Sequence, residues 1–257
     1  MKAIKLKKII EYMNELFPLS SAEEWDNSGI QLALSDEVHK VMSVLEITDS
    51  VVSEAISEDV DLIISHHPLF FSGVKSLSVD KAVDSFVIKL VQSNISVYSA
   101  HTSCDIACGG LNDYFGELIE VEDIQLLSEN NAYCRCGRSK KPMKLIDFCN
   151  FLSNKLSVPK SLIRYVGDGG QIISNIAWCT GSGMEFATCA YDKDVDVYVT
   201  GDVKHHNAVD ARQAGLNVID IGHFGSEYIF SQLIKAKLSK DICVIESKNC
   251  YNPIKSI

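Results

Sequence analysis

The sequence has few of the residues that mark extended or disordered chains, and it lacks long apolar segments. Its 257 residues include only 5 Pro and 15 Gly, which excludes collagen-like and low-complexity structure. No apolar run reaches the roughly 18 to 20 residues that a bilayer-spanning helix needs. With 46% hydrophobic and 23% charged residues, the composition indicates a globular chain of one large domain or two small ones.

Positive charge is also scarce. The 24 Lys and Arg residues are outnumbered by 34 Asp and Glu residues, and the formal net charge is -10. Because Lys and Arg are the residues that neutralise phosphate, we expect neither nucleic acid nor membrane as a partner. The basic first residues are followed by Glu11, Asn14 and Glu15, which interrupt the apolar core of a secretion signal. We therefore expect a cytoplasmic protein.

The nine cysteines contain no C-x-x-C pair, and their odd number does not fit a complete disulfide framework. Reduced thiols are the favoured interpretation. Cys134 and Cys136 are separated by a single residue in what we predict to be a polar loop, a spacing that disfavours zinc.

Apolar runs of strand length alternate with segments whose apolar residues have helical spacing. An amphipathic helix is predicted over Met1–Phe17, where Pro18 prevents its continuation. The order that follows is strand 41–45, helix 50–58, strand 62–64, helix 82–92 and strand 95–98. This alternation predicts an α/β fold with mostly parallel or mixed sheets covered by helices.

The chain repeats this order. Residues 44–61 align without a gap against residues 179–196, and both segments end in Asp-Val-Asp before an apolar strand. The alternative is that any two β-α-β units look alike at this level. We favour a repeat and predict two halves, residues 1–125 and 126–257, with the boundary in the polar stretch 120–139.

Histidines and carboxylates follow the predicted strands. The carboxyl ends of parallel strands meet at one edge of a sheet, where ligands bind. Imidazole and carboxylate groups together bind Zn, Fe, Mn or Co. Two adjacent histidines point in different directions, so two ions fit better than one, and a bridging carboxylate would complete a site that activates water. The candidate residues are His66, His67, His101, Asp105, His223 and Glu227.

Each of these features also has a simpler interpretation. A histidine pair at a strand end often caps the strand, and His101 with Asp105 or His223 with Glu227 could be a local hydrogen-bonded pair. His205 and His206 could bind substrate or begin a helix. The segment Trp25-Asp26-Asn27 is most simply a turn packed on the first helix. The agreement of strand, histidine and carboxylate order in both halves favours metal binding.

The chain resembles the type 2 GTP cyclohydrolase I family, also called the NIF-three-like family. The resemblance covers nearly the whole chain and rests on six stretches in the family's order. They are Trp25-Asp26-Asn27-Ser28-Gly29, Ile64-Ser65-His66-His67-Pro68-Leu69, Ser99-Ala100-His101-Thr102 with Asp105, Gly109-Gly110-Leu111-Asn112-Asp113, Thr200-Gly201-Asp202-Val203-Lys204-His205-His206, and Gly222-His223 with Glu227.

This resemblance implies two intertwined, duplicated α/β domains, a ring-shaped homohexamer and two divalent metal ions per chain. By position, the metal ligands would be His66, His67, Asp105, His223 and Glu227, with Glu227 bridging. The resemblance places His101 beside or on the second metal, so His101 and Glu227 are the candidate catalytic residues. This chain lacks room for the extra middle domain of the family's longer members.

The chain departs from the family pattern at Ser103 and Cys104, at Glu46 and at Phe224. None of these changes removes a ligand, but they affect the expected substrate and metal preference. The reaction implied is hydrolysis by a metal-bound hydroxide, with opening of the GTP purine ring at C8 and release of formate. Phosphoester hydrolysis by the same centre is a second hypothesis. A non-catalytic metal-binding hexamer that acts as a scaffold or regulator is the third.

Overall fold

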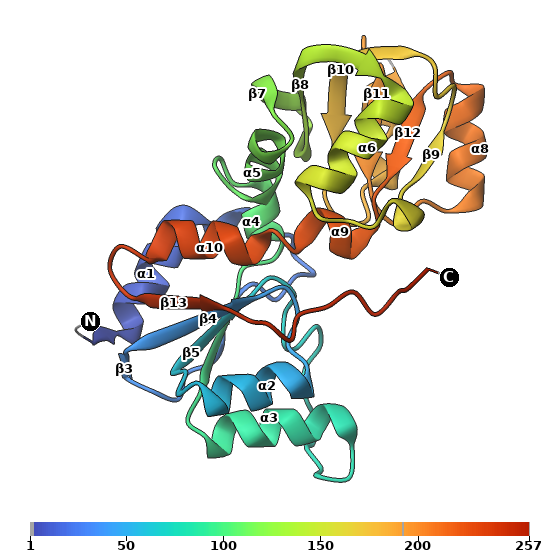
Figure 1. The fold of residues 1–257 in the computed structure, drawn as a ribbon. Coiled ribbons are helices and arrows are strands. Elements are labelled where there is room, and N and C mark those ends of the chain that lie inside the picture. Colours follow the sequence, from blue (N-terminus) through green and yellow to red (C-terminus); the bar gives the residue numbers. More distant parts are fainter. Residues whose placement is uncertain (1–2, 192, 257) are drawn as a thin grey trace. The chain divides into compact units, whose positions relative to one another are not determined.

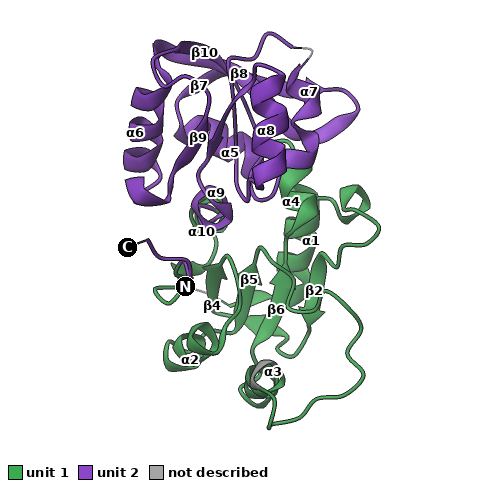
Figure 2. Cartoon of the chain, turned by 90° about the vertical axis from the view of Figure 1, so that its right-hand side faces the viewer, with its two compact units in different colours: residues 1–110, 230–251 green, residues 111–229, 252–257 purple. Residues whose placement is uncertain are grey.

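The computed structural model describes residues 3–191 and 193–256, and it has the α/β fold expected from the sequence (Figure 1). The chain forms two compact units, and each contains two segments (Figure 2). Residues 1–110 and 230–251 form unit 1, whereas residues 111–229 and 252–257 form unit 2. Met1 and Lys2, at the start of the first predicted helix, lie outside the described residues. Among the described residues, no helix combines the length and apolar content needed to cross a membrane.

Unit 1 is a mixed sheet with helices on both faces. Its elements are β1 (Ile4–Lys5), α1 (Leu6–Leu16), η1 (Leu19–Ser21), β2 (Gly29–Leu32), β3 (Glu37–Val38), β4 (Lys40–Val44), α2 (Asp49–Ser57), β5 (Leu62–Ser65), α3 (Ala82–Gln92), β6 (Ser96–Ser99), α4 (Thr102–Ile106), α10 (Phe230–Leu238) and β13 (Cys243–Glu246). The five-stranded sheet has the order β13-β4-β5-β6-β2, in which only β2 is antiparallel to its neighbour. Helices α2 and α3 cover one face, and α1 and α10 cover the other (Figure 1).

Local sequence explains why α2 begins and packs where it does. The hydroxyl of Thr48 accepts a hydrogen bond from the Val51 N–H at 3.4 Å and caps the helix. Val51, Val52 and Ala55 recur at helical spacing and are buried in the core between α2 and the sheet. The chain therefore enters β5 from a well-anchored helix, which sets the position of the residues that follow that strand.

Unit 2 is a six-stranded mixed sheet with the order β7-β8-β10-β11-β12-β9. Its elements are α5 (Leu111–Leu118), β7 (Val121–Ser128), β8 (Asn131–Lys144), α6 (Leu145–Lys155), η2 (Lys160–Leu162), β9 (Arg164–Val166), β10 (Ile172–Trp178), η3 (Met184–Phe186), α7 (Thr188–Tyr191), β11 (Val197–Thr200), α8 (His205–Gln213), β12 (Asn217–Asp220) and α9 (His223–Glu227). Strands β10, β11 and β12 are parallel, whereas β8 and β9 pair antiparallel with β10 and β12.

The repeat seen in the sequence is present in the two sheets. β4-β5-β6 and β10-β11-β12 are both runs of three parallel strands, and each has an antiparallel strand beside its third member. The carboxylate of Asp61 accepts hydrogen bonds from the His39 and Lys40 N–H groups, at 2.6 and 3.0 Å, where β4 begins. Its counterpart Asp196 accepts two such bonds in β10, from residues 174 and 175, both at 2.7 Å. The second Asp of each Asp-Val-Asp segment thus accepts two backbone hydrogen bonds from the neighbouring strand or the residue before it.

The polar stretch 120–139, in which we predicted the boundary between the two halves, forms strand β7 and part of strand β8. Cys134 and Cys136 accordingly lie on β8 rather than in a loop. Many side chains of this hairpin are exposed, and this obscures the apolar alternation that predicts a strand. The two units meet in sequence at Gly110 and Leu111, whereas the prediction was one boundary after residue 125. The chain then returns to unit 1 because β13 pairs with β4 and α10 packs on both strands.

Candidate metal centre

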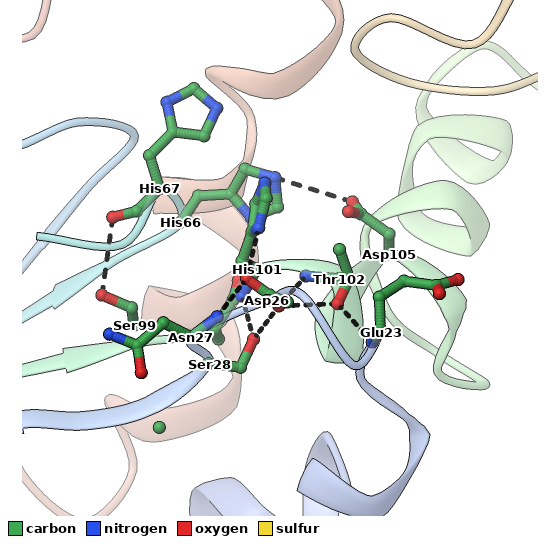
Figure 3. Close-up of polar contacts among 12 residues, drawn as sticks. Glu23, Asp26, Asn27, Ser28, His66, His67, Ser99, His101, Thr102 and Asp105 are labelled. Carbon is green, nitrogen blue, oxygen red and sulfur yellow. Dashed lines mark hydrogen bonds and ion pairs between the residues drawn. The ribbon is translucent and has the colours of Figure 1, made fainter. Parts of the chain in front are cut away.

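Three histidines of unit 1 lie together at the carboxyl ends of its parallel strands (Figure 3). His66 and His67 directly follow β5, and His101 follows β6. One ring nitrogen of each histidine lies within 4.8 Å of a ring nitrogen of the other two. The expected gathering of strand-end histidines is therefore observed in unit 1.

His66 has a defined orientation and tautomer. Its Nδ1 lies 2.8 Å from the carbonyl oxygen of Ala100, which can only accept a hydrogen bond, so Nδ1 carries the proton. Its Nε2 faces the Asp105 carboxylate at 3.6 Å (Figure 3). His66 is fully buried, and a buried imidazole held in this way presents Nε2 in a fixed direction.

His101 is oriented by Asp26, a residue that the sequence analysis placed in a simple turn. Nδ1 of His101 lies 2.8 Å from the Asp26 carboxylate, which also accepts hydrogen bonds from the Thr102 N–H, the Thr102 hydroxyl and the Ser28 hydroxyl. Burial alone would raise the pKa of Asp26, but the hydrogen bonds from His101, Ser28 and Thr102 hold it well below its usual value. The carboxylate therefore stays ionised and fixes the imidazole ring (Figure 3).

The short helix α4 explains the spacing of His101 and Asp105. His101 is the N-cap residue, and its carbonyl oxygen accepts the Asp105 N–H at 3.1 Å. One helical turn separates the two side chains, so they project from the same side of α4. Ser103 and Cys104, the departures from the family pattern, lie between them and are both fully buried.

Unit 2 has a second histidine and carboxylate pair on α9. His223 Nε2 lies 2.9 Å from the Glu227 carboxylate, and its Nδ1 lies 2.8 Å from the Asp202 carboxylate. The hydrogen bond with Glu227 is the main reason that the pKa of His223 rises to about 9, with a further contribution from Asp202 and in spite of burial. Two carboxylates on one imidazole create a position that attracts positive charge, whether a proton or a metal ion.

Gly181 makes room for Glu227. A Cβ atom at this position would lie 2.1 Å from the Glu227 Oε1 atom, and the backbone φ of Gly181 is +66°. Its N–H also donates to the Ser226 hydroxyl at 2.8 Å. Glycine is required here both for the conformation and for the close approach of the carboxylate.

Asp220, at the end of β12, connects the two turns that carry His223 and Asp202. Its Oδ1 accepts the Gly222 N–H at 2.9 Å, and its Oδ2 accepts the Val203 N–H at 3.2 Å. Arg164 donates to the same buried carboxylate. Asp220 thereby holds the backbone on both sides of the His223–Asp202 hydrogen bond.

Comparison with known proteins identifies the family. The family described as Duf34/NIF3 (NGG1p interacting factor 3) matches residues 4–253. The chain belongs to the Duf34/NIF3 family. A Lactococcus lactis protein named GTP cyclohydrolase 1 type 2 homolog is 34% identical, with 97% of this chain and 100% of that protein covered. A Clostridium perfringens protein of the same name is 31% identical, with 99% and 100% covered.

Solved structures agree with this assignment. A hypothetical protein of Staphylococcus aureus has a TM-score of 0.92 and 29% identity, and all of both chains is covered. A Bacillus cereus protein related to NIF3 has the same TM-score at 22% identity, which shows a shared fold. The relatives match from end to end, so the NIF3 fold extends over both units of this chain.

The donor atoms of this NIF3 family member fit a divalent transition metal. They are imidazole nitrogens and carboxylate oxygens, a combination that suits Zn, Fe, Mn or Co better than the all-oxygen sites of Ca²⁺ and Mg²⁺. Ligand histidines almost always donate their other ring nitrogen to a carbonyl or carboxylate group. His66, His101 and His223 each have such a partner on Nδ1.

His205 and His206 do not belong to either cluster by their local structure. Both are exposed and form the first two residues of α8, so the interpretation as a helix start is confirmed. In the gapless alignment of the two halves, the counterparts of His66 and His67 are instead Gly201 and Asp202. The alignment of Asp202 with His67 is the sequence signal by which Asp202 could have been found.

Proposed function

We propose that His66, His67, Asp105, His223 and Glu227 hold two divalent metal ions per chain and that the protein is a metal-dependent hydrolase. One observation carries the proposal. The Nδ1 atoms of His66, His101 and His223 are held by a carbonyl or carboxylate group, so Nε2 is the atom that each imidazole presents to a ligand. Histidines that bind metal ions almost always have this arrangement, and it supports the proposal for that reason.

The bound ions would act as Lewis acids and bring the pKa of a water molecule toward neutrality. Side chains of the protein would transfer protons and position the ligands. His101, with Asp26 ionised behind it, can accept a proton at Nε2 because the carboxylate stabilises the imidazolium that forms. Glu227 is kept close to His223 by α9 and by the space that Gly181 leaves.

The name shared by the relatives suggests the substrate. We propose that water adds to C8 of the GTP purine ring, that the ring opens, and that hydrolysis of the resulting formamide releases formate. Two observations support this substrate. The chain carries imidazole and carboxylate groups of the kind that bind catalytic metal ions, and its relatives are named GTP cyclohydrolase 1 type 2 homolog. We further propose a homohexamer, whose mass light scattering would determine.

The first test measures metal and product on the same preparation. Protein purified without chelator or histidine tag should contain close to two metal ions per chain by plasma mass spectrometry. Incubation with GTP should then release formate in proportion to the bound metal. Two ions without formate would reject the GTP reaction and favour the non-catalytic metal-binding hexamer, whereas the absence of metal would reject both.

A variant pair separates the centre from general damage. His101→Ala should abolish formate release while it leaves the fold intact by circular dichroism. His39→Ala is the matched control, because the His39 side chain is 62% exposed at the start of β4. Equal activity of the two variants would contradict the role of His101 in proton transfer.

A further inference from the structure

Two large aromatic side chains lie exposed beside His101. Trp25 is 64% exposed and Phe71 is 58% exposed. Their ring centroids lie 5.9 and 5.8 Å from the His101 ring, and both rings stand nearly perpendicular to it, at 76° and 89°. Exposed aromatic side chains next to a polar cluster are typical of ligand-binding surfaces.

Hydrogen bonds hold the two segments that carry these aromatic side chains together. The side-chain amide of Asn27 donates to the carbonyl oxygen of Phe70 at 2.6 Å and to the side chain of Gln31 at 3.0 Å. Gln31 in turn donates to the Asn27 carbonyl oxygen at 2.6 Å. Trp25 directly precedes Asp26, which His101 and Thr102 hold by hydrogen bonds, and Phe71 directly follows Phe70, whose carbonyl oxygen Asn27 holds. Hydrogen bonds thus hold the backbone next to both aromatic residues, and this lowers the entropic cost of binding a ligand.

We propose that Trp25 and Phe71 bind the heterocyclic base of a nucleoside substrate by stacking beside His101. This inference rests on the proposed function, because it names the part of the substrate that this surface takes. Every nucleobase has flat π faces that stack on aromatic side chains, and such stacking needs no cationic residue. It therefore suits a chain whose net charge is -10 and which binds phosphate only where a local cation permits.

Tryptophan fluorescence tests the proposal directly. The chain has 2 Trp residues, and Trp178 is fully buried, so the long-wavelength emission reports on Trp25. Titration of the metal-loaded protein with guanosine should quench this emission to saturation, whereas ribose 5-phosphate, which has no base, should not. Calorimetry should show that Trp25→Ala and Phe71→Ala each weaken guanosine binding about tenfold, and that Trp25→Phe restores most of the affinity.

The control is Tyr251→Ala, because Tyr251 is an equally exposed aromatic residue at 65% in the C-terminal part of unit 1. It should bind guanosine as the unmodified protein does. Wild-type affinity in both alanine variants, or no guanosine binding by the unmodified protein, would overturn the proposal. A change of oligomeric mass in Trp25→Ala with unchanged guanosine affinity would also overturn it and would assign the surface to contact with a second copy.

Guanosine stacking on Trp25 and Phe71 and formate release from GTP can be tested independently. Guanosine carries no phosphate, and binding is measured without turnover. Bound guanosine with no formate from GTP would keep the stacking surface and reject the cyclohydrolase reaction. Formate release that persists at unchanged KM for GTP in Trp25→Ala would keep the reaction and reject the stacking surface.

Discussion

In unit 1, strand β5 is followed by His66 and His67. In unit 2, the equivalent strand β11 is followed by Gly201 and Asp202. Both halves nonetheless position a histidine after the third parallel strand and a carboxylate one helical turn later. In unit 1 the orienting carboxylate on that histidine is Asp26, which comes from the N-terminal turn. In unit 2 it is Asp202, which comes from the end of the central strand.

The two halves of the fold therefore differ in the residues that follow the second parallel strand, but both have a histidine and a carboxylate after the third. The end of the central strand supplies candidate metal ligands in one half and an orienting carboxylate in the other. The histidine and carboxylate on the short helices α4 and α9 are retained, because helical geometry alone brings their side chains together. Substitutions at three pairs of equivalent residues test this comparison, and a fourth concerns a contact within unit 1; the largest expected effect comes first.

Removal of the helical carboxylates should have the largest effect. Glu227→Ala and its counterpart Asp105→Ala should each lose at least one metal ion per chain, measured by plasma mass spectrometry on protein prepared without chelator. The reason is that a site deprived of a charged ligand loses both a bond and the negative charge that attracts the ion. Glu185→Ala, an exposed carboxylate of η3, is the control. Full occupancy in Glu227→Ala would refute its assignment as the bridging ligand.

The orienting carboxylates should come next. Asp202→Asn should lower metal affinity about 10- to 100-fold in a chelator competition, because Asp202 orients the proposed ligand His223. Asp26→Asn should instead lower formate release, because Asp26 orients His101. Only Asp26→Asn should also destabilise the fold, by about 2 kcal/mol in urea, because its side chain is fully buried and holds several hydrogen bonds.

The Asp202 side chain is 47% exposed, so its substitution should leave the unfolding midpoint nearly unchanged. Asp210→Asn, an exposed position on α8, controls for the loss of one charge. Unchanged metal affinity in Asp202→Asn, or unchanged formate release in Asp26→Asn, would mean that the histidine concerned needs no orienting carboxylate.

The repeated Asp61 and Asp196 offer a smaller and symmetrical effect. Each carboxylate accepts two backbone hydrogen bonds from the neighbouring strand, so Asp61→Asn and Asp196→Asn should each cost about 1 to 2 kcal/mol of stability. Neither should change metal content. Thermal unfolding of the two variants measures the effect, and a large shift in one variant with none in the other would argue against equivalent roles.

The smallest effect concerns a contact of unit 1. Burial alone would raise the pKa of Glu54, but hydrogen bonds from Ser247, Lys248 and Asn249 hold this pKa below its usual value. A carboxylate with a lowered folded-state pKa stabilises the protein above its unfolded-state pKa and loses that contribution as the pH falls through the folded-state value.

Glu54→Gln should therefore lower the melting temperature slightly at neutral pH, and the difference should shrink as the pH falls through the lowered pKa of Glu54. Glu58→Gln, at the end of the same helix, is the control. A difference that grows on acidification would contradict the direction of the Glu54 pKa.

The elements with strong apolar periodicity were predictable from the sequence. The helix expected over 82–92 is α3, and the strands expected at 41–45, 62–64 and 95–98 are β4, β5 and β6 within one residue or so. The β7–β8 hairpin escaped prediction because its exposed residues carry no clear alternation. The helices α4 and α9 escaped it because 5 residues are too short for a periodic signal.

The family, the α/β class and the candidate residues were determined by the sequence itself, since they depend on residue identity, order and spacing along the chain. Tertiary structure decided which carboxylate orients which histidine. Asp26 and His101 are 75 positions apart, and Asp202 and His223 are 21 apart, so no local pattern connects them. Those contacts form only when β-α-β packing brings strand ends and turns together, and side-chain hydrogen bonding is then determined by distance in space.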